Sequence, residues 1–221
     1  MIITFSNRKS GVGKSSLCLA LANYVASNNI PVKVIDVDPQ QSLCKTRKRD
    51  LEVYNITPQY DILKYNLSEQ LDEFSKHVDE LKKSDEFILF DTPAGINSDI
   101  FMYLIMFSDY VIVPFKFETY SIDATGRYSM ALRMLEKLYP LQQRSVIYIP
   151  NMVDTKSENY SLYNNASGCD LKMGTYFENK SPNIPLHNCM QIRNSLFLAP
   201  EALTCVSSCF EYLTKVILHR L

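Results

Sequence analysis

The first part of the chain alternates between short apolar runs and longer segments in which apolar residues recur every three or four positions. The apolar runs are typical of strands buried on both faces of a sheet, and the periodic segments are typical of helices. Strands separated by helices predict an α/β fold, with a mostly parallel, twisted sheet and helices on both faces. The predicted strands are 2–6, 32–37, 86–90, 110–114 and 145–149, and the predicted helices are 15–27, 67–83, 97–107, 121–138 and 201–221.

The pattern weakens after Asn151. Residues 154–182 are rich in Ser, Asn, Tyr and Lys, and we expect a long connection there before the C-terminal helix. No repeat or convincing linker divides the sequence. A length of 221 residues suits one α/β domain, so we predict a single domain over residues 1–221.

Composition narrows the classes of function. Lys and Arg number 23 against 24 for Asp and Glu, so any nucleic-acid contact must use a local basic patch and not bulk charge. No run approaches the roughly 18 apolar residues that span a membrane, and no signal peptide is visible. The six cysteines include no C-x-x-C pair, which favours free thiols in a reducing compartment. We therefore expect a cytoplasmic protein without a stable membrane anchor.

A glycine-containing loop lies between the first predicted strand and the first predicted helix. Residues 9–16 are K-S-G-V-G-K-S-S, and Gly11 and Gly13 are two of only 6 glycines in the chain. In such a loop successive backbone N–H groups point at a phosphate, and the helix N-terminus adds a partial positive charge. Glycine is needed where the backbone approaches the anion or adopts a positive φ. The segment predicts a phosphate-binding loop.

The side chains at the end of this loop extend the prediction to a nucleotide. Lys14 is expected to reach the β- and γ-phosphates, Ser15 to place its hydroxyl on Mg²⁺, and Ser16 to contact the α-phosphate. The strict pattern G-x-x-x-x-G-K-[ST] is not met, because Arg8 stands at the position of the first glycine. A second lysine, Lys9, is present in the loop instead.

Two apolar runs end in acidic residues. The second predicted strand ends with Asp36 and Asp38 close together, and the third is followed by Asp91. Ligands of open α/β sheets bind at the carboxyl ends of the strands. Because Mg²⁺ usually keeps several waters, we expect Asp91 to reach the metal through water. For Asp36 we expect a structural role.

These three segments together resemble the ParA/MinD group of P-loop ATPases. K-S-G-V-G-K-S is similar to its deviant Walker A box, K-G-G-x-G-K-[ST], with Ser10 in place of a glycine. D-V-D-P-Q at residues 36–40 is similar to the D-x-D-P-Q segment of ParA-type proteins, and D-T-P-A at residues 91–94 to the D-x-P segment of the same family. The resemblance implies ATP and Mg²⁺ as ligands, with the nucleotide held by Lys9, Gly11, Val12, Gly13, Lys14, Ser15 and Ser16.

Catalytic roles follow from the resemblance for three residues. Asp38 is expected to orient the attacking water near the γ-phosphate, and Lys14 to act on the phosphates of its own subunit. Lys9 is expected to reach the phosphates of a partner subunit. This parallels an arginine finger, which is worth roughly 10³–10⁵ in rate.

The later part of the chain supplies the expected base contacts. Y-I-P-N at residues 148–151 resembles the family's strand that ends beside the adenine, so Asn151 is expected to contact the base. N-I-P at residues 183–185 resembles a later segment that packs on the ring, which implies a contact from Pro185.

The function implied is ATP-driven partition or positioning of DNA, on a plasmid, a chromosome or a mobile element. R-K-R-D at residues 47–50 resembles the R-x-R-D stretch of ParA-like proteins on Bacteroides-type mobile elements. The implied partners are a second copy in the ATP state, a ParB-like activator protein and non-specific DNA, with a nucleoid-associated location. The candidate DNA contacts are Lys45–Arg49, Lys172, Lys180, Arg193, Lys215 and Arg220.

Two alternatives stay open. A MinD-like membrane-cycling ATPase would use its C-terminal helix, but only Lys215 and Arg220 give that segment firm positive charge, and we expect the helix to pack on the core. A dethiobiotin-synthetase-like ligase on a related fold would hydrolyse ATP only with an organic substrate. Such a ligase would not be expected to use Lys9 in trans.

Overall fold

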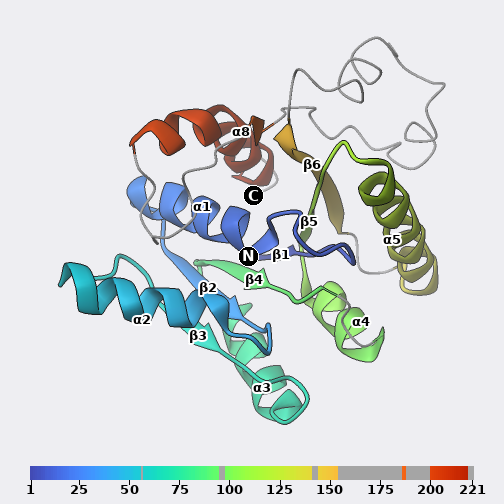
Figure 1. The fold of residues 1–221 in the computed structure, drawn as a ribbon. Helices are drawn as coiled ribbons and strands as arrows, with labels where there is room; N and C mark the ends of the chain where they lie inside the picture. Colours follow the sequence, from blue (N-terminus) through green and yellow to red (C-terminus); the bar gives the residue numbers. More distant parts are fainter. Residues whose placement is uncertain (56, 95–97, 141–143, 154–185, 188–199, 219–221) are drawn as a thin grey trace.

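The computed structural model describes residues 1–55, 57–94, 98–140, 144–153, 186–187 and 200–218. Strands and helices alternate along the chain (Figure 1). The strands are β1 (Ile2–Phe5), β2 (Val32–Asp36), β3 (Ile62–Lys64), β4 (Phe87–Asp91), β5 (Tyr110–Phe115), β6 (Ser145–Val153) and β7 (Leu186–His187). The helices are α1 (Lys14–Ser27), α2 (Ser42–Tyr54), α3 (Leu71–Leu81), α4 (Ser98–Phe107), α5 (Thr119–Leu138) and α8 (Pro200–Leu218).

The described strands form one sheet in the order β3-β2-β4-β1-β5-β6-β7, and each neighbouring pair is parallel. β1 lies between β4 and β5, and all of its residues are buried. β4 and β5 are likewise buried along their whole length. Burial on both faces explains why these strands are continuously apolar and do not alternate. The prediction of a parallel sheet in an α/β fold is confirmed.

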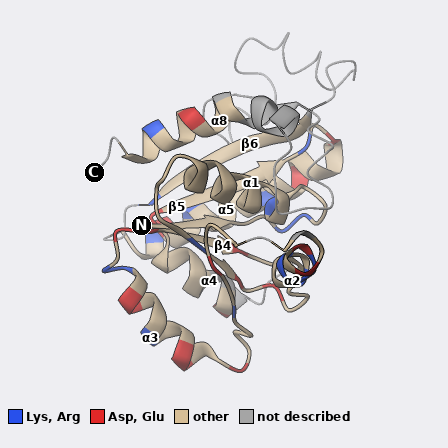
Figure 2. Cartoon of the chain, turned by 90° about the vertical axis from the view of Figure 1, so that its left-hand side faces the viewer, with Lys and Arg blue, Asp and Glu red and all other residues tan. Residues whose placement is uncertain are grey.

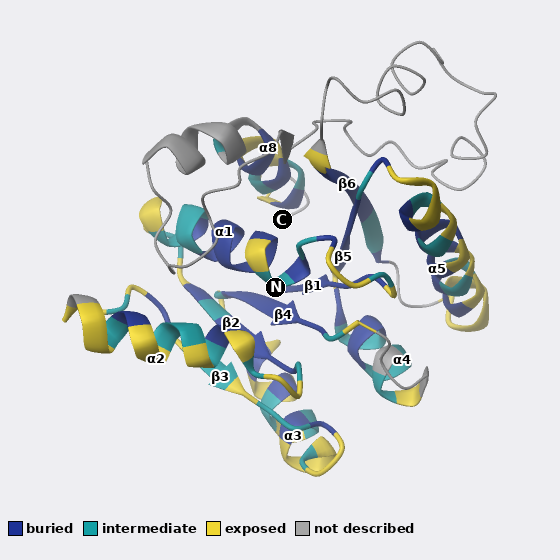
Figure 3. Cartoon of the chain, viewed as in Figure 1, coloured by how far each residue is buried: buried dark blue, intermediate teal, exposed yellow. Residues whose placement is uncertain are grey.

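Helices cover both faces of the sheet, and the buried residues lie between the layers (Figure 3). Side chains of α1, α2 and α8 pack on one face, and those of α3, α4 and α5 pack on the other. The C-terminal helix α8 buries Phe210, Leu213 and Ile217 in the core that it shares with α1 and the sheet. It is therefore a packed helix, as expected from its few positive charges.

Three elements of the structure are absent from the sequence prediction, namely α2, β3 and β7. Helix α2 has a largely polar sequence without a strong apolar period, and strand β3 has only three residues. Helix α3 begins at Leu71, later than the predicted residue 67. The expected connection over residues 154–182 lies outside the described residues.

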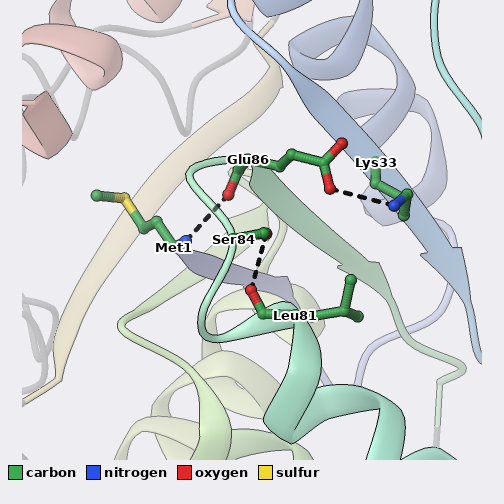
Figure 4. A network of polar contacts seen from close by, with 5 residues as sticks. All are labelled: Met1, Lys33, Leu81, Ser84 and Glu86. Carbon is green, nitrogen blue, oxygen red and sulfur yellow. Dashed lines mark hydrogen bonds and ion pairs between the residues drawn. The ribbon is translucent and has the colours of Figure 1, made fainter.

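A small polar network ties the amino ends of three central strands together (Figure 4). The amino group of Met1 donates to the Glu86 carbonyl oxygen at 3.0 Å, and Lys33 Nζ lies 3.1 Å from Glu86 Oε2. The Ser84 hydroxyl donates to the Leu81 carbonyl at 2.9 Å and closes the turn after α3. These contacts fix the starts of β1, β2 and β4 at one level, so that the strands also end together at the opposite edge.

Charged residues are spread over the helices, and α2 carries a run of basic residues (Figure 2). Lys45, Lys48 and Arg49 of α2 are exposed. Among the described helices, none combines the length and the apolar character needed to cross a bilayer.

Candidate nucleotide-binding site

The loop between β1 and α1 has the backbone shape expected of a phosphate-binding loop. Gly11 and Gly13 take φ values of 70° and 90°, in the left-handed region that favours glycine. Helix α1 begins at Lys14, and the Leu17 N–H donates to the Gly13 carbonyl at 2.9 Å. The N–H groups of the first helical turn have no partner within a helix, so they are free to bind an anion.

Ser10 and Arg8 do not disturb this loop. Both side chains are exposed, and neither residue is among those with a positive φ. The two substitutions relative to the usual glycine patterns therefore cause no backbone strain, because only Gly11 and Gly13 need the left-handed region.

The loop is in contact with the end of β6. The Asn151 side chain is buried, and its Nδ2 donates to the Val12 carbonyl oxygen at 2.8 Å. A Cβ atom on Gly13 would collide with the same Nδ2. Asn151 therefore holds the loop in place, while its contact with the base stays a prediction.

The loop opens onto a cavity of about 350 Å³ at the carboxyl ends of β1, β2 and β4. Five of its lining residues were given no role from the sequence, namely Gln40, Ser42, Thr92, Pro93 and Ala94. These residues lie within or just after the D-x-D-P-Q and D-T-P-A segments, so the two segments indicated where they would be found. The lining residues are Ser10, Gly11, Gly13, Lys14, Ser15, Ser16, Asp38, Gln40, Ser42, Thr92, Pro93 and Ala94.

Lys14 lines this cavity, and its charge interacts with that of the buried Asp91. Lys14 is 7% exposed, and burial lowers its pKa while the charges of Asp91 and Asp38 oppose that shift. Asp91 is fully buried, and burial raises the pKa of its carboxyl to about 7. The nearby Ser15 hydroxyl and Lys14 act in the opposite direction.

The Asp91 carboxylate suits the water shell of a metal ion. Ser15 lies close enough to lower its pKa, yet neither carboxylate oxygen accepts a hydrogen bond of good geometry from the described residues. Buried carboxylate oxygens normally have donors, and metal-bound waters would supply them. A carboxylate and a hydroxyl beside a phosphate loop are the hard oxygen ligands that Mg²⁺ takes. These residues fit Mg²⁺ with a nucleotide.

Asp36 and Asp38 have different surroundings although they are two residues apart. Asp36 is fully buried, and its carboxylate accepts the backbone N–H groups of Leu43 at 3.1 Å and Cys44 at 3.3 Å, at the start of α2. It also accepts the Asp38 N–H at 3.2 Å. Asp36 is thus a structural anchor, as expected, and it fixes the loop that carries Asp38.

Asp38 is half-buried and points its carboxylate at the cavity edge. Its Oδ1 accepts the Gln40 N–H at 2.8 Å, which orients the side chain. The second carboxylate oxygen is then available for a ligand or a water. Pro185, the predicted ring contact, lies outside the described residues.

Comparison with known proteins gives the family. Residues 3–167 match the family model described as the CobQ/CobB/MinD/ParA nucleotide binding domain. The chain belongs to this family. A curated relative is the sporulation initiation inhibitor protein Soj of Bacillus subtilis (strain 168), 23% identical over 168 residues. That match covers 62% of this chain and 66% of Soj, just under two thirds of the relative's length.

Solved structures share the CobQ/CobB/MinD/ParA fold along nearly the whole chain. A protein assigned to plasmid partition in Borrelia burgdorferi B31, bound to AMPPNP, has a TM-score of 0.71 and 17% identity, with 100% of this chain and 98% of that chain covered. A variant of McdA from Cyanothece in complex with ATP has a TM-score of 0.72 and 13% identity, covering 98% and 95%. At this identity they establish the fold, and the ParA/MinD resemblance is confirmed.

The two lysines of the family's loop have different positions in this chain. Lys14 lines the cavity, whereas Lys9 is half-buried and does not contribute to the cavity lining. Lys9 is held through its backbone, whose N–H donates to Asn7 Oδ1 at 3.0 Å. Its role, like those of the other predicted site residues, stays a prediction.

Proposed function

We propose that the protein is a ParA-type ATPase that binds ATP with Mg²⁺, dimerises in that state and hydrolyses ATP slowly to partition or position DNA. The observation that carries the proposal is that the glycine loop, Lys14 and Asp38 line one cavity, with the buried Asp91 close enough for its charge to act on Lys14 and with Lys9 outside the lining.

Each of these residues has a separate role in phosphoryl transfer. The N–H groups at the start of α1 and the Lys14 ammonium neutralise phosphate charge. Ser15 and Asp91 would hold Mg²⁺, which would supply neutralisation of the charge on the phosphate oxygens. Asp38, oriented by its bond to the Gln40 N–H, positions the attacking water. Buried carboxylates beside a buried lysine act strongly because little solvent screens them.

Lys9 supplies the reason for dimerisation. Lys9 is not among the residues that line the cavity of its own subunit, and the resemblance assigns such a lysine to the phosphates of a partner. A cation that completes the site only in the dimer couples subunit association to the bound triphosphate. The dimer would then carry DNA on its surface, with a ParB-like protein as activator and the nucleoid as its location.

The test is size-exclusion chromatography with light scattering in ADP, ATP and AMPPNP. The protein should be a monomer in ADP and a dimer in AMPPNP, and Lys9→Ala should remain a monomer in both. Arg8→Ala, which removes the neighbouring exposed cation, is the matched control and should dimerise. Failure of the parent protein to dimerise in either triphosphate would refute the proposal, and dimerisation of Lys9→Ala would refute the trans role.

A further inference from the structure

Asn7 lies between the end of β1 and the phosphate loop, and its side chain is almost fully buried at 1% exposure. Its amide makes three hydrogen bonds to three parts of the chain. Nδ2 donates to the Pro114 carbonyl oxygen at 2.8 Å and to Thr125 Oγ1 at 2.9 Å. Oδ1 accepts the Lys9 N–H at 3.0 Å.

The orientation of this amide is fixed by its partners. A backbone carbonyl can only accept a hydrogen bond and a backbone N–H can only donate one, so the nitrogen must face Pro114 and the oxygen must face Lys9. Both N–H groups are used. The pattern from Oδ1 to the N–H two residues on is an Asx turn, which sets the direction in which the chain leaves β1.

The contacts connect the loop to rigid elements far along the sequence. Pro114 belongs to β5 and Thr125 to α5, which lie 107 and 118 residues from Asn7. The preceding residue, Ser6, has its hydroxyl 3.2 Å from the Thr92 hydroxyl, in the segment that lines the cavity. The turn that carries Lys9 is therefore braced from two sides of β1.

Lys9 depends on this brace more than Lys14 does. Lys14 is fixed by the first turn of α1 and by its burial beside Asp91. Lys9 precedes both left-handed glycines and lies outside the helix, so its direction is set by the turn that Asn7 closes.

We propose that Asn7 is a positioning residue for Lys9, holding that lysine in the direction needed to reach a partner subunit. The inference rests on the proposed function, in which Lys9 acts in trans. Asn7 acts through the Lys9 backbone and contributes little to the binding of nucleotide by the monomer.

The test compares dimerisation with nucleotide binding in the same variants. Asn7→Ala should weaken AMPPNP-driven dimerisation by roughly tenfold, as expected for the loss of a buried hydrogen-bond partner. The affinity for a fluorescent ADP analogue, which reports on the loop of the monomer, should change by less than about threefold. Asn7→Ser should restore part of the dimerisation, because its hydroxyl can accept from the N–H two residues on.

A double-mutant cycle then distinguishes positioning from general stabilisation. If Asn7 acts through Lys9, Asn7→Ala should have no further effect on residual turnover once Lys9→Ala is present. Thr4→Val is the matched control, since it also removes a buried polar contact but at a distance from the loop. The Thr4 hydroxyl lies in β1 and is hydrogen-bonded to the Ser108 hydroxyl at 2.6 Å. It should lower the melting temperature without altering AMPPNP-driven dimerisation.

The inference is overturned if Asn7→Ala dimerises like the parent, or if it weakens ADP binding as much as dimerisation. Additive effects of Asn7→Ala and Lys9→Ala would also overturn it. If Asn7→Ala does not fold, Thr125→Val removes one acceptor of Nδ2 and must give the same selective loss of dimerisation. A parent protein that fails to dimerise rejects this inference together with the proposed function, whereas normal dimerisation of Asn7→Ala alone rejects only the inference.

Discussion

Asn151 lies so close to Gly13 that there is no room for a side chain at position 13. The Asn151 amide occupies the space that a Cβ on Gly13 would need and bonds to the Val12 carbonyl at 2.8 Å. The phosphate loop is therefore enclosed between α1, which continues it, and the end of β6, which presses on it. This contact explains the need for glycine at position 13 by two separate effects, a left-handed φ and a lack of space.

The two loop glycines should respond differently to alanine. Gly11→Ala meets open space, so it should weaken nucleotide binding only by the left-handed backbone strain, roughly tenfold for ~1–2 kcal/mol. Gly13→Ala must also displace Asn151, and should weaken binding at least about tenfold further. Titration with a fluorescent ATP analogue measures both. Equal losses in the two variants would show that Asn151 moves aside easily.

Asp91 should make the nucleotide-free protein less stable as the pH rises. Its pKa is about 7 in the folded state and near 3.8 when unfolded, so between those values the folded state holds a proton that the unfolded state has lost. The contribution of Asp91 to the free energy of unfolding is fully present below about pH 4. It is lost as the pH rises to about 7, and the loss amounts to about 4 kcal/mol.

Urea unfolding of the parent and of Asp91→Asn at several pH values measures this effect. The asparagine cannot ionise, so the variant should gain stability over the parent as pH rises from 4 to 8. A difference between the two proteins that does not change with pH would contradict the burial of an ionisable Asp91.

Asp38 should be needed for turnover and not for binding. Asp38→Asn is the sharper variant, because an asparagine oxygen can still accept the Gln40 N–H that orients the side chain. Its ATPase rate should fall by at least about 100-fold, as for the loss of a positioned carboxylate, while AMPPNP affinity stays within a few-fold. Asp79→Asn, at an exposed position on α3, is the control. Hydrolysis at the parent rate would remove Asp38 from the catalytic role.

Helix α2 is the described surface best suited to DNA. Lys45 and Lys48 are exposed there, with Lys48 Nζ 4.0 Å from Glu52 Oε1, whereas Lys215 is paired more closely with Glu211 at 2.6 Å. Lys172, Lys180, Arg193 and Arg220 lie outside the described residues. Lys45→Glu with Lys48→Glu should weaken duplex binding in ATP and reduce the salt slope by about 2, since each phosphate contact contributes about −0.9. Fluorescence anisotropy across a salt series measures the slope.

The control for this pair is Lys76→Glu with Lys83→Glu, two exposed lysines of α3 and the turn that follows it. It imposes the same change of net charge. Equal weakening by both pairs would assign the effect to overall charge, and no weakening by either would remove α2 as a DNA contact. ATP turnover without DNA should be unchanged in both.

The central strands and the acidic strand ends could be predicted because local pattern determines them. A strand buried on both faces must be apolar, and parallel strands bring their carboxyl ends to one edge, where Asp38 lines the cavity with the loop and Asp91 interacts with Ser15 and Lys14. Helix α2 escaped prediction because its own sequence has few apolar residues, and its start is fixed instead by hydrogen bonds to the Asp36 carboxylate.

The bracing of the loop could not be predicted because its partners lie far from it in the sequence. The three partners of Asn7 lie in different elements, and no spacing in the sequence indicates that Pro114 and Thr125 come together beside residue 7. The contact between Asn151 and Val12 likewise depends on the packing of β6 against α1, over a separation of 139 residues.

The central place of β1 has a consequence for how the protein assembles during synthesis. Its neighbours β4 and β5 are made late: the Ile2 N–H binds the Asp109 carboxylate, 107 residues further on. The nucleotide cradle therefore cannot close around the earliest segment to leave the ribosome until roughly half the polypeptide has followed. Pairing between strands that are far apart in the sequence favours slow folding. ATP binding should therefore report whether the sheet has folded.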